Sequence, residues 1–312
     1  MMSNPKKTLL DLWDVFRNTF NRWNDANPWR QSAILAYYSI FSLPPLLLIV
    51  IAVVGYFFGE EAISRQLSER ISQWMGKDSA RMIEGMVASA ADTGSSTWAM
   101  ALGVGFLLFG ATTVFFHLQL SLNRIWGVVP KPKKAFLKYL KDRLLSFGLV
   151  LVIGFLLLIS MLANSLLAIL SDWIKAYWEG IQLPFLVATN YTLSLVLTTA
   201  LFALMFKYLP DAIIRWRSVL VGALLTALLF ALGQFGLRIY FVNFDPASAY
   251  GAAGAMILFL TWVSYVAMIV LFGAEFTRQW ALKFGHGIRP KGSAILYEDL
   301  DGSEDKYSVD TE

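Results

Sequence analysis

Residues 251–274 have the sequence GAAGAMILFLTWVSYVAMIVLFGA, a stretch of 24 residues without a charged side chain. An α-helix needs about 20 mostly apolar residues to cross the roughly 30 Å hydrocarbon core of a bilayer. The stretch is therefore long enough to span a membrane. Uncharged apolar runs of about this length recur along the chain, so the same interpretation extends to most of the protein.

Six such runs predict six membrane-spanning helices. They cover residues 33–58, 97–116, 144–170, 183–206, 218–237 and 251–274. Hydrophobic residues make up 57% of the chain, charged residues only 15%, and the mean hydropathy is +0.56. Because the runs are continuously apolar and do not alternate as barrel strands do, they favour helices. The predicted fold class is an all-α membrane protein with six transmembrane helices and amphipathic interfacial helices.

Basic residues gather in alternate connections, which predicts the orientation of the chain. The N-terminus, residues 118–143, residues 207–217 and the C-terminus are the basic segments, and such segments stay in the cytoplasm. Both termini are therefore predicted to be cytoplasmic. One basic run comprises Lys131, Lys133, Lys134, Lys138, Lys141 and Arg143. Its place beside a span indicates contact with anionic lipid headgroups, and no nucleic-acid partner is expected.

Three segments outside the spans complete the predicted domain organisation. Residues 1–32 form a cytoplasmic amphipathic helix, in which apolar residues such as Leu9, Trp13, Phe16 and Phe20 recur at spacings of three and four. Residues 33–277 form the six-helix domain, with two external amphipathic helices at about 60–91. Residues 278–312 form a cytoplasmic acidic tail that is predicted to be largely disordered.

The first span carries two successive prolines, Pro44 and Pro45. Each proline removes a backbone donor, so the helix is predicted to be kinked or broken there. Broken spans often mark substrate sites in transporters, although a packed proline kink is the alternative. At the start of the sixth span, Gly251, Gly254 and Ala255 are candidate helix-packing residues, and such contacts would also allow a homo-oligomer.

Polar and aromatic residues near the cytoplasmic ends of spans one, two and six form the main candidate site. They are Tyr37, Tyr38, His117, Asn123, Arg124, Trp126 and Glu275. A carboxylate near the hydrocarbon edge needs a partner, and Arg124 and His117 are the expected donors to Glu275. The cluster is either a substrate site or an interfacial ion pair that fixes the helix ends.

Several catalytic chemistries find no support in the sequence. The chain has two histidines, no cysteine, no phosphate-binding P-loop and no Gly-x-Ser-x-Gly motif. No pair of histidines has the spacing of metal ligands. We therefore expect no metal, no cofactor and no enzymatic activity.

Four segments together resemble the YihY/BrkB family of bacterial inner-membrane proteins. They are Ala36 to Pro45, Asn123 to Trp126, Tyr250 to Gly254 and Gly273 to Thr277. The resemblance implies a six-helix, multi-pass inner-membrane protein, and some members of the family have been proposed to move envelope lipids, but it supplies no settled activity. The predicted break in the first span, the cytoplasmic polar cluster and the external amphipathic helices favour transport or handling of an envelope lipid or another amphipathic substrate, with membrane lipids as partners. A non-catalytic scaffold or assembly factor is the alternative. An enzyme is less favoured, either a membrane-bound hydrolase or the ribonuclease that an older label of the family names.

Overall fold

A computed structural model describes residues 5–91, 97–131, 135–177, 182–244, 253–292 and 294–297. The described helices are α1 (Pro5–Asp25), α2 (Pro28–Phe58), α3 (Glu60–Met75), α4 (Lys77–Ala91), α5 (Thr97–Ile125), α6 (Ala135–Tyr177), α7 (Gln182–Tyr208), α8 (Trp216–Phe244) and α9 (Gly254–Phe284). Four short strands are β1 (Val128–Pro130), β2 (Ala212–Ile213), β3 (Arg289–Pro290) and β4 (Ala294–Leu296). The predicted all-α character is therefore confirmed.

Four helices in the described part of the chain are long and apolar enough to cross a membrane. They are Pro28–Phe57, Tyr191–Tyr208, Trp216–Phe241 and Gly254–Phe284. The two other predicted spans, residues 97–116 and 144–170, lie within α5 and α6, where many side chains are outside the described set. The protein is thus a helical membrane protein with at least these four candidate spans.

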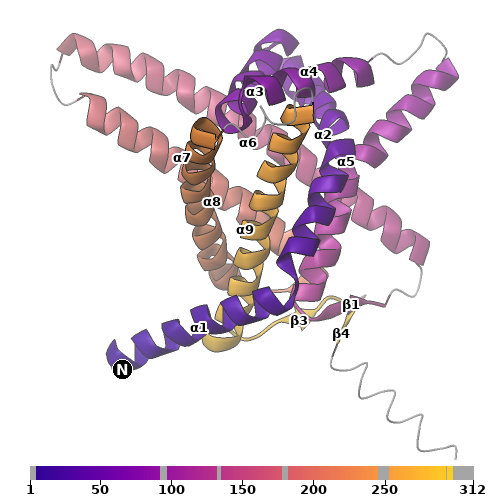
Figure 1. The fold of residues 1–312 in the computed structure, drawn as a ribbon, viewed down its shortest axis with the longest axis vertical. Coiled ribbons are helices and arrows are strands. Elements are labelled where there is room, and N and C mark those ends of the chain that lie inside the picture. The colour runs from indigo at the N-terminus through magenta and orange to yellow at the C-terminus, as the bar shows by residue number, and fades with distance from the viewer. Residues whose placement is uncertain are drawn as a thin grey trace, which may run out of the picture.

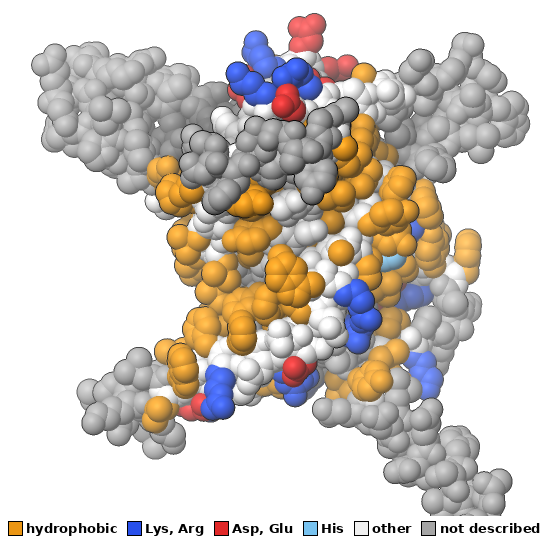
Figure 2. All heavy atoms as spheres, viewed as in Figure 1, with side chains coloured by type: hydrophobic (Ala, Val, Ile, Leu, Met, Phe, Trp, Pro, Cys, Tyr) orange, Lys and Arg blue, Asp and Glu red, His pale blue; other side chains and the backbone are white. Residues whose placement is uncertain are grey.

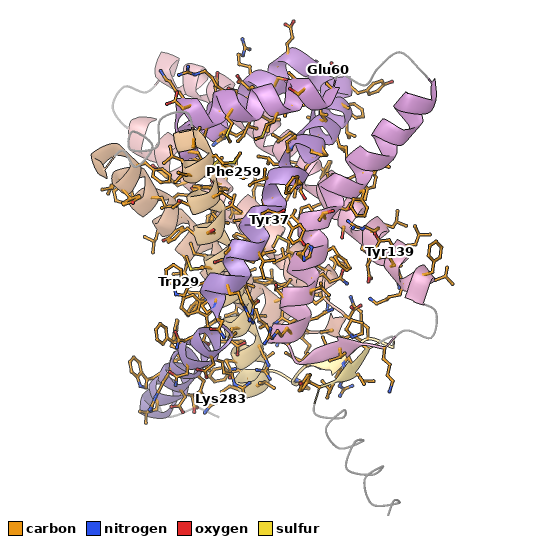
Figure 3. The ribbon with its side chains drawn as sticks, turned by 45° about the vertical axis from the view of Figure 1, so that its right-hand side comes forward. Trp29, Tyr37, Glu60, Tyr139, Phe259 and Lys283 are labelled. Atoms are coloured by element: carbon orange, nitrogen blue, oxygen red, sulfur yellow. The ribbon has the colours of Figure 1, made fainter. Side chains whose placement is uncertain are left out.

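The molecule has two polar ends separated by an apolar belt. Helix α1 and the strands lie at one end, and α3 and α4 lie at the other (Figure 1). Figure 2 shows charged side chains gathered at both ends and hydrophobic side chains between them. Glu60 and Lys283 mark these two ends in Figure 3. An exposed apolar surface of this extent matches the hydrocarbon of a bilayer better than water.

The first span is predicted to be kinked or broken at its prolines, and the break is wrong, because α2 is one continuous helix through Pro44 and Pro45. Gly110 of α5 packs directly on the Pro45 ring, so that a Cβ at Gly110 would lie 3.0 Å from it. The buried Ser42 hydroxyl accepts the Val114 N–H of α5 at 3.1 Å. Close packing by a neighbouring helix therefore supports α2 across the prolines.

Helix α1 presents apolar side chains in two directions. Phe16 contacts Phe276 of α9, with ring centroids 5.1 Å apart, and Val15 is buried. Trp13 and Phe20 are more than half exposed. Asn27, in the left-handed region at φ 54°, separates α1 from α2. The exposed aromatic face suits a helix that lies on a membrane surface, as the sequence predicts.

Helices α3 and α4 cover the opposite end of the bundle. Gly59 and Gly76, with φ of 88° and 85°, make the turns before them. Ile71 and Ile83 join a buried cluster with Phe259 of α9. The pattern of apolar residues in 60–91 thus corresponds to two helices that cap the bundle.

The segment after the last span is more structured than predicted. Helix α9 continues through residue 278 to Phe284, because Phe276, Trp280 and Phe284 pack in sequence along it. Beyond it, β3 pairs with β2, and β4 pairs with β1, both antiparallel. The predicted tail boundary at 278 is therefore wrong. The acidic residues from Glu298 onward lie outside the described residues.

Candidate functional site

Two groups of polar side chains lie between the helices, and the first is centred on Tyr38 and His117. Tyr38 of α2 stacks on His117 of α5, with ring centroids 3.6 Å apart and planes 14° apart. Tyr37 packs edge-on against Tyr38 and remains 56% exposed. The structure thus brings three of the predicted site residues together.

Arg143 of α6 lies beside this group: its guanidinium is 5.4 Å from the ring centroid of Phe116, which packs edge-on against His117. The sequence suggested only a headgroup role for it. Its Nη1 donates to Thr112 Oγ1 at 2.8 Å and to the Phe109 carbonyl at 3.2 Å. Its Nε donates to the Tyr139 hydroxyl at 3.1 Å, and the guanidinium lies 4.3 Å from the Phe109 ring centroid. Figure 3 shows Tyr37 on α2 and Tyr139 on α6, two of the elements that frame the group. All of these partners are neutral.

Within the described part of the chain, the charge of Arg143 is therefore not balanced by an ion pair. Among the described residues, no ion pair joins Arg143 to a carboxylate. Leu140 and Leu144 beside it, and Phe109 beneath it, are at least half exposed, so it borders an apolar surface. Thr112 lies four residues, or about 6 Å, before the end of the predicted span 97–116, and Arg143 directly precedes the predicted span 144–170, so the guanidinium lies at the edge of the apolar region. A cation that borders hydrocarbon is costly to keep without an anionic partner.

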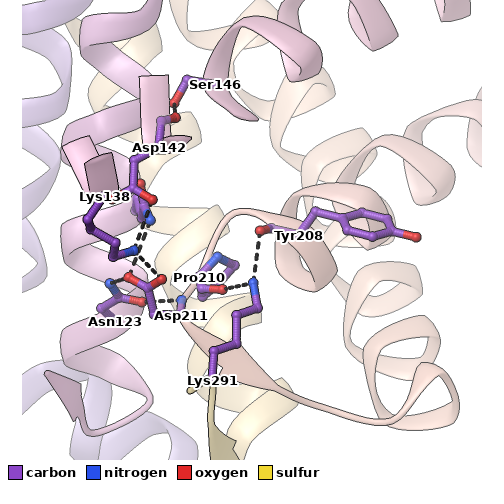
Figure 4. Close-up of polar contacts among 9 residues, drawn as sticks. Asn123, Lys138, Asp142, Ser146, Tyr208, Pro210, Asp211 and Lys291 are labelled. Carbon is purple, nitrogen blue, oxygen red and sulfur yellow. Dashed lines mark hydrogen bonds and ion pairs between the residues drawn. The ribbon is translucent and has the colours of Figure 1, made fainter. Parts of the chain in front are cut away.

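A second polar group surrounds Asp211, in the connection between α7 and α8 (Figure 4). Asn123 Nδ2 donates to Asp211 Oδ2 at 2.9 Å, and Asn123 Oδ1 accepts the Asp211 N–H at 2.8 Å. Lys138 of α6 pairs with Asp211 and, at 2.9 Å, with Asp142. Gln119 Nε2 donates to Asp211 at 3.4 Å. These five side chains are nearly buried, so they bind α5, α6 and the α7–α8 connection together.

Lys291 links the segment after α9 to the same group. Its backbone N–H donates to the Asp211 carbonyl at 2.9 Å, and its ammonium donates to the carbonyls of Tyr208 and Pro210. Burial lowers the pKa of Lys291, and the negative charge of Asp211 opposes that shift. The C-terminal segment is therefore fastened to the buried polar group.

Glu275 is not paired as predicted. Gln279 Nε2 donates to its Oε1 at 2.6 Å, and Arg278 Nη1 lies 3.6 Å from the same atom. Both partners lie on α9 itself, three and four residues later, where side chains share one helix face. Arg124, one predicted donor, is exposed, and His117 stacks on Tyr38 instead. The predicted ion pairs of Glu275 with Arg124 and His117 are wrong.

The remaining predicted site residues lie apart from one another and do not form one cluster. Trp126 is buried and donates its indole N–H to the Ala274 carbonyl at 3.0 Å. Gly254 is buried at the start of α9, and the Ala255 carbonyl accepts the Ser79 hydroxyl of α4 at 3.4 Å. Gly251 lies outside the described residues. The predicted single cluster is thus divided into an Arg143 group, an Asp211 group and the surroundings of Glu275.

Sequence reasoning missed Asp211, Lys138, Asp142 and Gln119 as members of one group. Asp211 lies 88 residues from Asn123 and 73 from Lys138, so no local spacing connects them. A signal does exist for Asp211, since it is a single carboxylate between two apolar spans. Within the described residues, no group of three His, Cys, Asp or Glu side chains could hold a metal ion.

Comparison with known proteins gives a consistent result over nearly the whole chain. The model of the family described as "Virulence factor BrkB" matches residues 19–293. A UPF0761 membrane protein of Saccharophagus degradans is 28% identical over 296 residues, which is 95% of this chain and 65% of that protein. A UPF0761 membrane protein of Alcanivorax borkumensis is 29% identical over 260 residues, which is 82% of this chain and 58% of that protein. The chain thus spans 58 to 65% of the length of these relatives, and no solved structure matches it.

Proposed function

Because the chain belongs to the BrkB family of membrane proteins, we propose that it is a non-enzymatic protein of the bacterial inner membrane that handles an amphipathic envelope lipid. Arg143 binds the anionic headgroup of that lipid, and the exposed apolar side chains beside it contact the acyl chains. Tyr37, Tyr38 and His117 form the neighbouring wall of the site.

In this proposal, helices α2, α5, α6, α7, α8 and α9 cross the bilayer and both termini are cytoplasmic. The N-terminal helix and the C-terminal strands lie at the same end of the molecule (Figure 1), in agreement with an even number of crossings. The basic segments 118–143 and 207–217 also lead to this end. Arg143 is then reached from the cytoplasmic half of the membrane.

The unbalanced charge of Arg143 is the observation that carries the proposal. A guanidinium whose bonds go to a carbonyl and to hydroxyl groups keeps its positive charge, and phosphate is the anion whose geometry it matches best. The apolar neighbours Leu140 and Leu144 favour a lipid phosphate over that of a polar solute, because a solute needs a polar path. Of the residues that a scaffold role would use for association, Gly254 is buried and the Ala255 carbonyl accepts the Ser79 hydroxyl, so the described start of α9 already packs within the chain.

The test compares Arg143→Gln with Arg143→Lys and with the control Arg124→Gln, which removes an exposed cation. Native mass spectrometry measures phosphatidylglycerol retained by each protein in detergent. A charge-assisted hydrogen bond contributes about 1.5–3 kcal/mol, so Arg143→Gln should reduce retention about tenfold or more. Arg143→Lys should retain an intermediate amount, and the control should match the wild type. Equal retention by Arg143→Gln and the wild type would contradict the proposal.

A further inference from the structure

The guanidinium of Arg143 and the hydroxyl of Tyr139 both keep a free hydrogen-bond donor. Arg143 Nη1 and Nε are bonded within the protein, whereas Nη2 has no partner among the described residues. The Tyr139 hydroxyl accepts the Nε–H of Arg143, so its own O–H remains available to donate. Arg143 is only partly buried, and Tyr139 is 40% exposed. Both side chains can therefore donate to an atom of a ligand.

His117 is a second side chain that can carry a positive charge here. Its ring stacks on Tyr38, and within the part of the chain that the structure describes neither ring nitrogen is hydrogen-bonded or fully buried. Histidine changes its charge near neutral pH, so this ring can donate one or two N–H groups to an anion. The group thus contains a permanent cation, Arg143, and a conditional one, His117.

These two side chains are close enough to bind one phosphate group. Arg143 Nη1 lies 3.3 Å from Thr113 Oγ1, and His117 follows Thr113 by four residues on α5. Side chains four residues apart share one helix face, with Cβ atoms about 5–6 Å apart. The charge of Arg143 also acts electrostatically on His117. Two hydrogen bonds of about 2.8 Å, one to each side chain, allow a single phosphate to bridge them.

The number of donors selects the class of phosphate. A phosphodiester headgroup carries a single negative charge, which Arg143 balances alone. A phosphomonoester carries a charge of about −1.5 to −2 at pH 7 and has three strongly accepting terminal oxygens. It therefore gains from a second cation and from a third donor. His117 supplies the cation, and the Tyr139 O–H supplies the third donor.

We propose that the Arg143 group is selective for a phosphomonoester, which binds between Arg143 and His117 and accepts the Tyr139 O–H. The phosphomonoester is either the headgroup of a lipid, as in phosphatidic acid, or part of a soluble molecule. The exposed side chains of Leu140 and Leu144 beside Arg143 favour the lipid. The lipid source rests on the proposed function, whereas the preference for a second negative charge goes beyond it.

The experiment compares phosphatidic acid, a phosphomonoester, with phosphatidylmethanol, a phosphodiester with a small headgroup and the same acyl chains. Equal amounts, with one lipid deuterated to separate the masses, are mixed with each protein, and native mass spectrometry counts the retained lipids. The wild type should prefer phosphatidic acid about tenfold or more, because it gains a charged hydrogen bond. His117→Asn should lose this preference. The control His286→Asn, at the other histidine of the chain, should keep it.

Glycerol 3-phosphate, which carries a phosphomonoester without acyl chains, distinguishes the two sources. If it raises the Tm of the wild type but not that of His117→Asn, and neither lipid is preferred, the ligand is a soluble phosphomonoester. If the wild type shows neither a lipid preference nor an effect of glycerol 3-phosphate, the inference is wrong, and this result depends on no variant. A His117→Asn protein that melts like the wild type and keeps the preference would also contradict it. Failure of the proposed function has a different sign, which is unchanged total lipid retention in Arg143→Gln.

Discussion

Lys138 is the residue on which the balance of charge around Asp211 depends. Its ammonium lies between the carboxylates of Asp142 and Asp211, and all three groups are nearly buried. Lys138→Met should destabilise the protein by about 3–5 kcal/mol, because it leaves two buried carboxylates without their shared cation. Thermal unfolding in detergent measures the loss. The control is Lys141→Met, at an exposed position on the same helix, which should change the Tm little.

The double variant Lys138→Met with Asp211→Asn separates charge from packing. It removes one carboxylate together with the ammonium, so much of the lost stability should return. If the double variant is as unstable as the sum of the two single variants, the ion pairs do not account for the effect.

Residue-level prediction succeeded or failed according to the sequence separation of the partners. Glu275, Arg278 and Gln279 have the spacing of one helix face, so the true partners of Glu275 could have been predicted from the chain alone. The Asp211 group could not, because its members come from three separate segments. Arg143 was identified only as one of six basic residues, and its contacts with α5 depend on how the helices pack.

At the scale of elements, α8 and α9 approach each other through a reciprocal contact. A Cβ at Gly222 of α8 would lie 1.8 Å from Thr277 Oγ1 of α9, and a Cβ at Gly273 of α9 would lie 1.8 Å from Thr226 Oγ1 of α8. Each threonine hydroxyl donates to the carbonyl of the glycine four residues before it. This is close packing of the kind that small residues permit between membrane helices.

Gly273→Ala should therefore destabilise the protein by about 1–3 kcal/mol or more, since the new methyl group overlaps Thr226. Thermal unfolding in detergent gives the measurement. The control Gly236→Ala, on α8, has no atom within 4 Å of its new Cβ and should be neutral or slightly stabilising. Adding Thr226→Ala to Gly273→Ala should restore part of the loss. A Gly273→Ala protein as stable as Gly236→Ala would contradict the contact.

The apolar runs were sufficient to predict where the long helices lie, because length and hydropathy are properties of one segment. They were insufficient to predict that α2 continues through its prolines, because that depends on packing against Gly110 and Val114 of the neighbouring helix. The small residues that make the close α8–α9 contact, Gly222 and Gly273, also differ from those singled out at the start of the sixth span. Which helix faces contact each other can therefore be known only from the tertiary structure.

For the whole molecule, the orientation in the membrane is the prediction that most directly constrains the lipid site. The chain contains no cysteine, so a single introduced cysteine can be labelled without background. Ser64 is exposed on α3 and Lys131 is exposed directly after β1, at opposite ends of the molecule (Figure 1). The basic segments predict that the Lys131 end is cytoplasmic.

A membrane-impermeant maleimide should therefore label Ser64→Cys in intact spheroplasts and Lys131→Cys only after the membrane is permeabilised. The unsubstituted protein should give no signal in either condition. The reverse pattern would place both termini outside the cytoplasm, and Arg143 would then be reached from the periplasmic leaflet. Labelling of both variants in intact spheroplasts would mean that the two polar ends are not separated by the bilayer. Only the expected pattern allows the Arg143 group to take a lipid from the cytoplasmic leaflet, because the guanidinium lies on the α6 segment that begins at the Lys131 end.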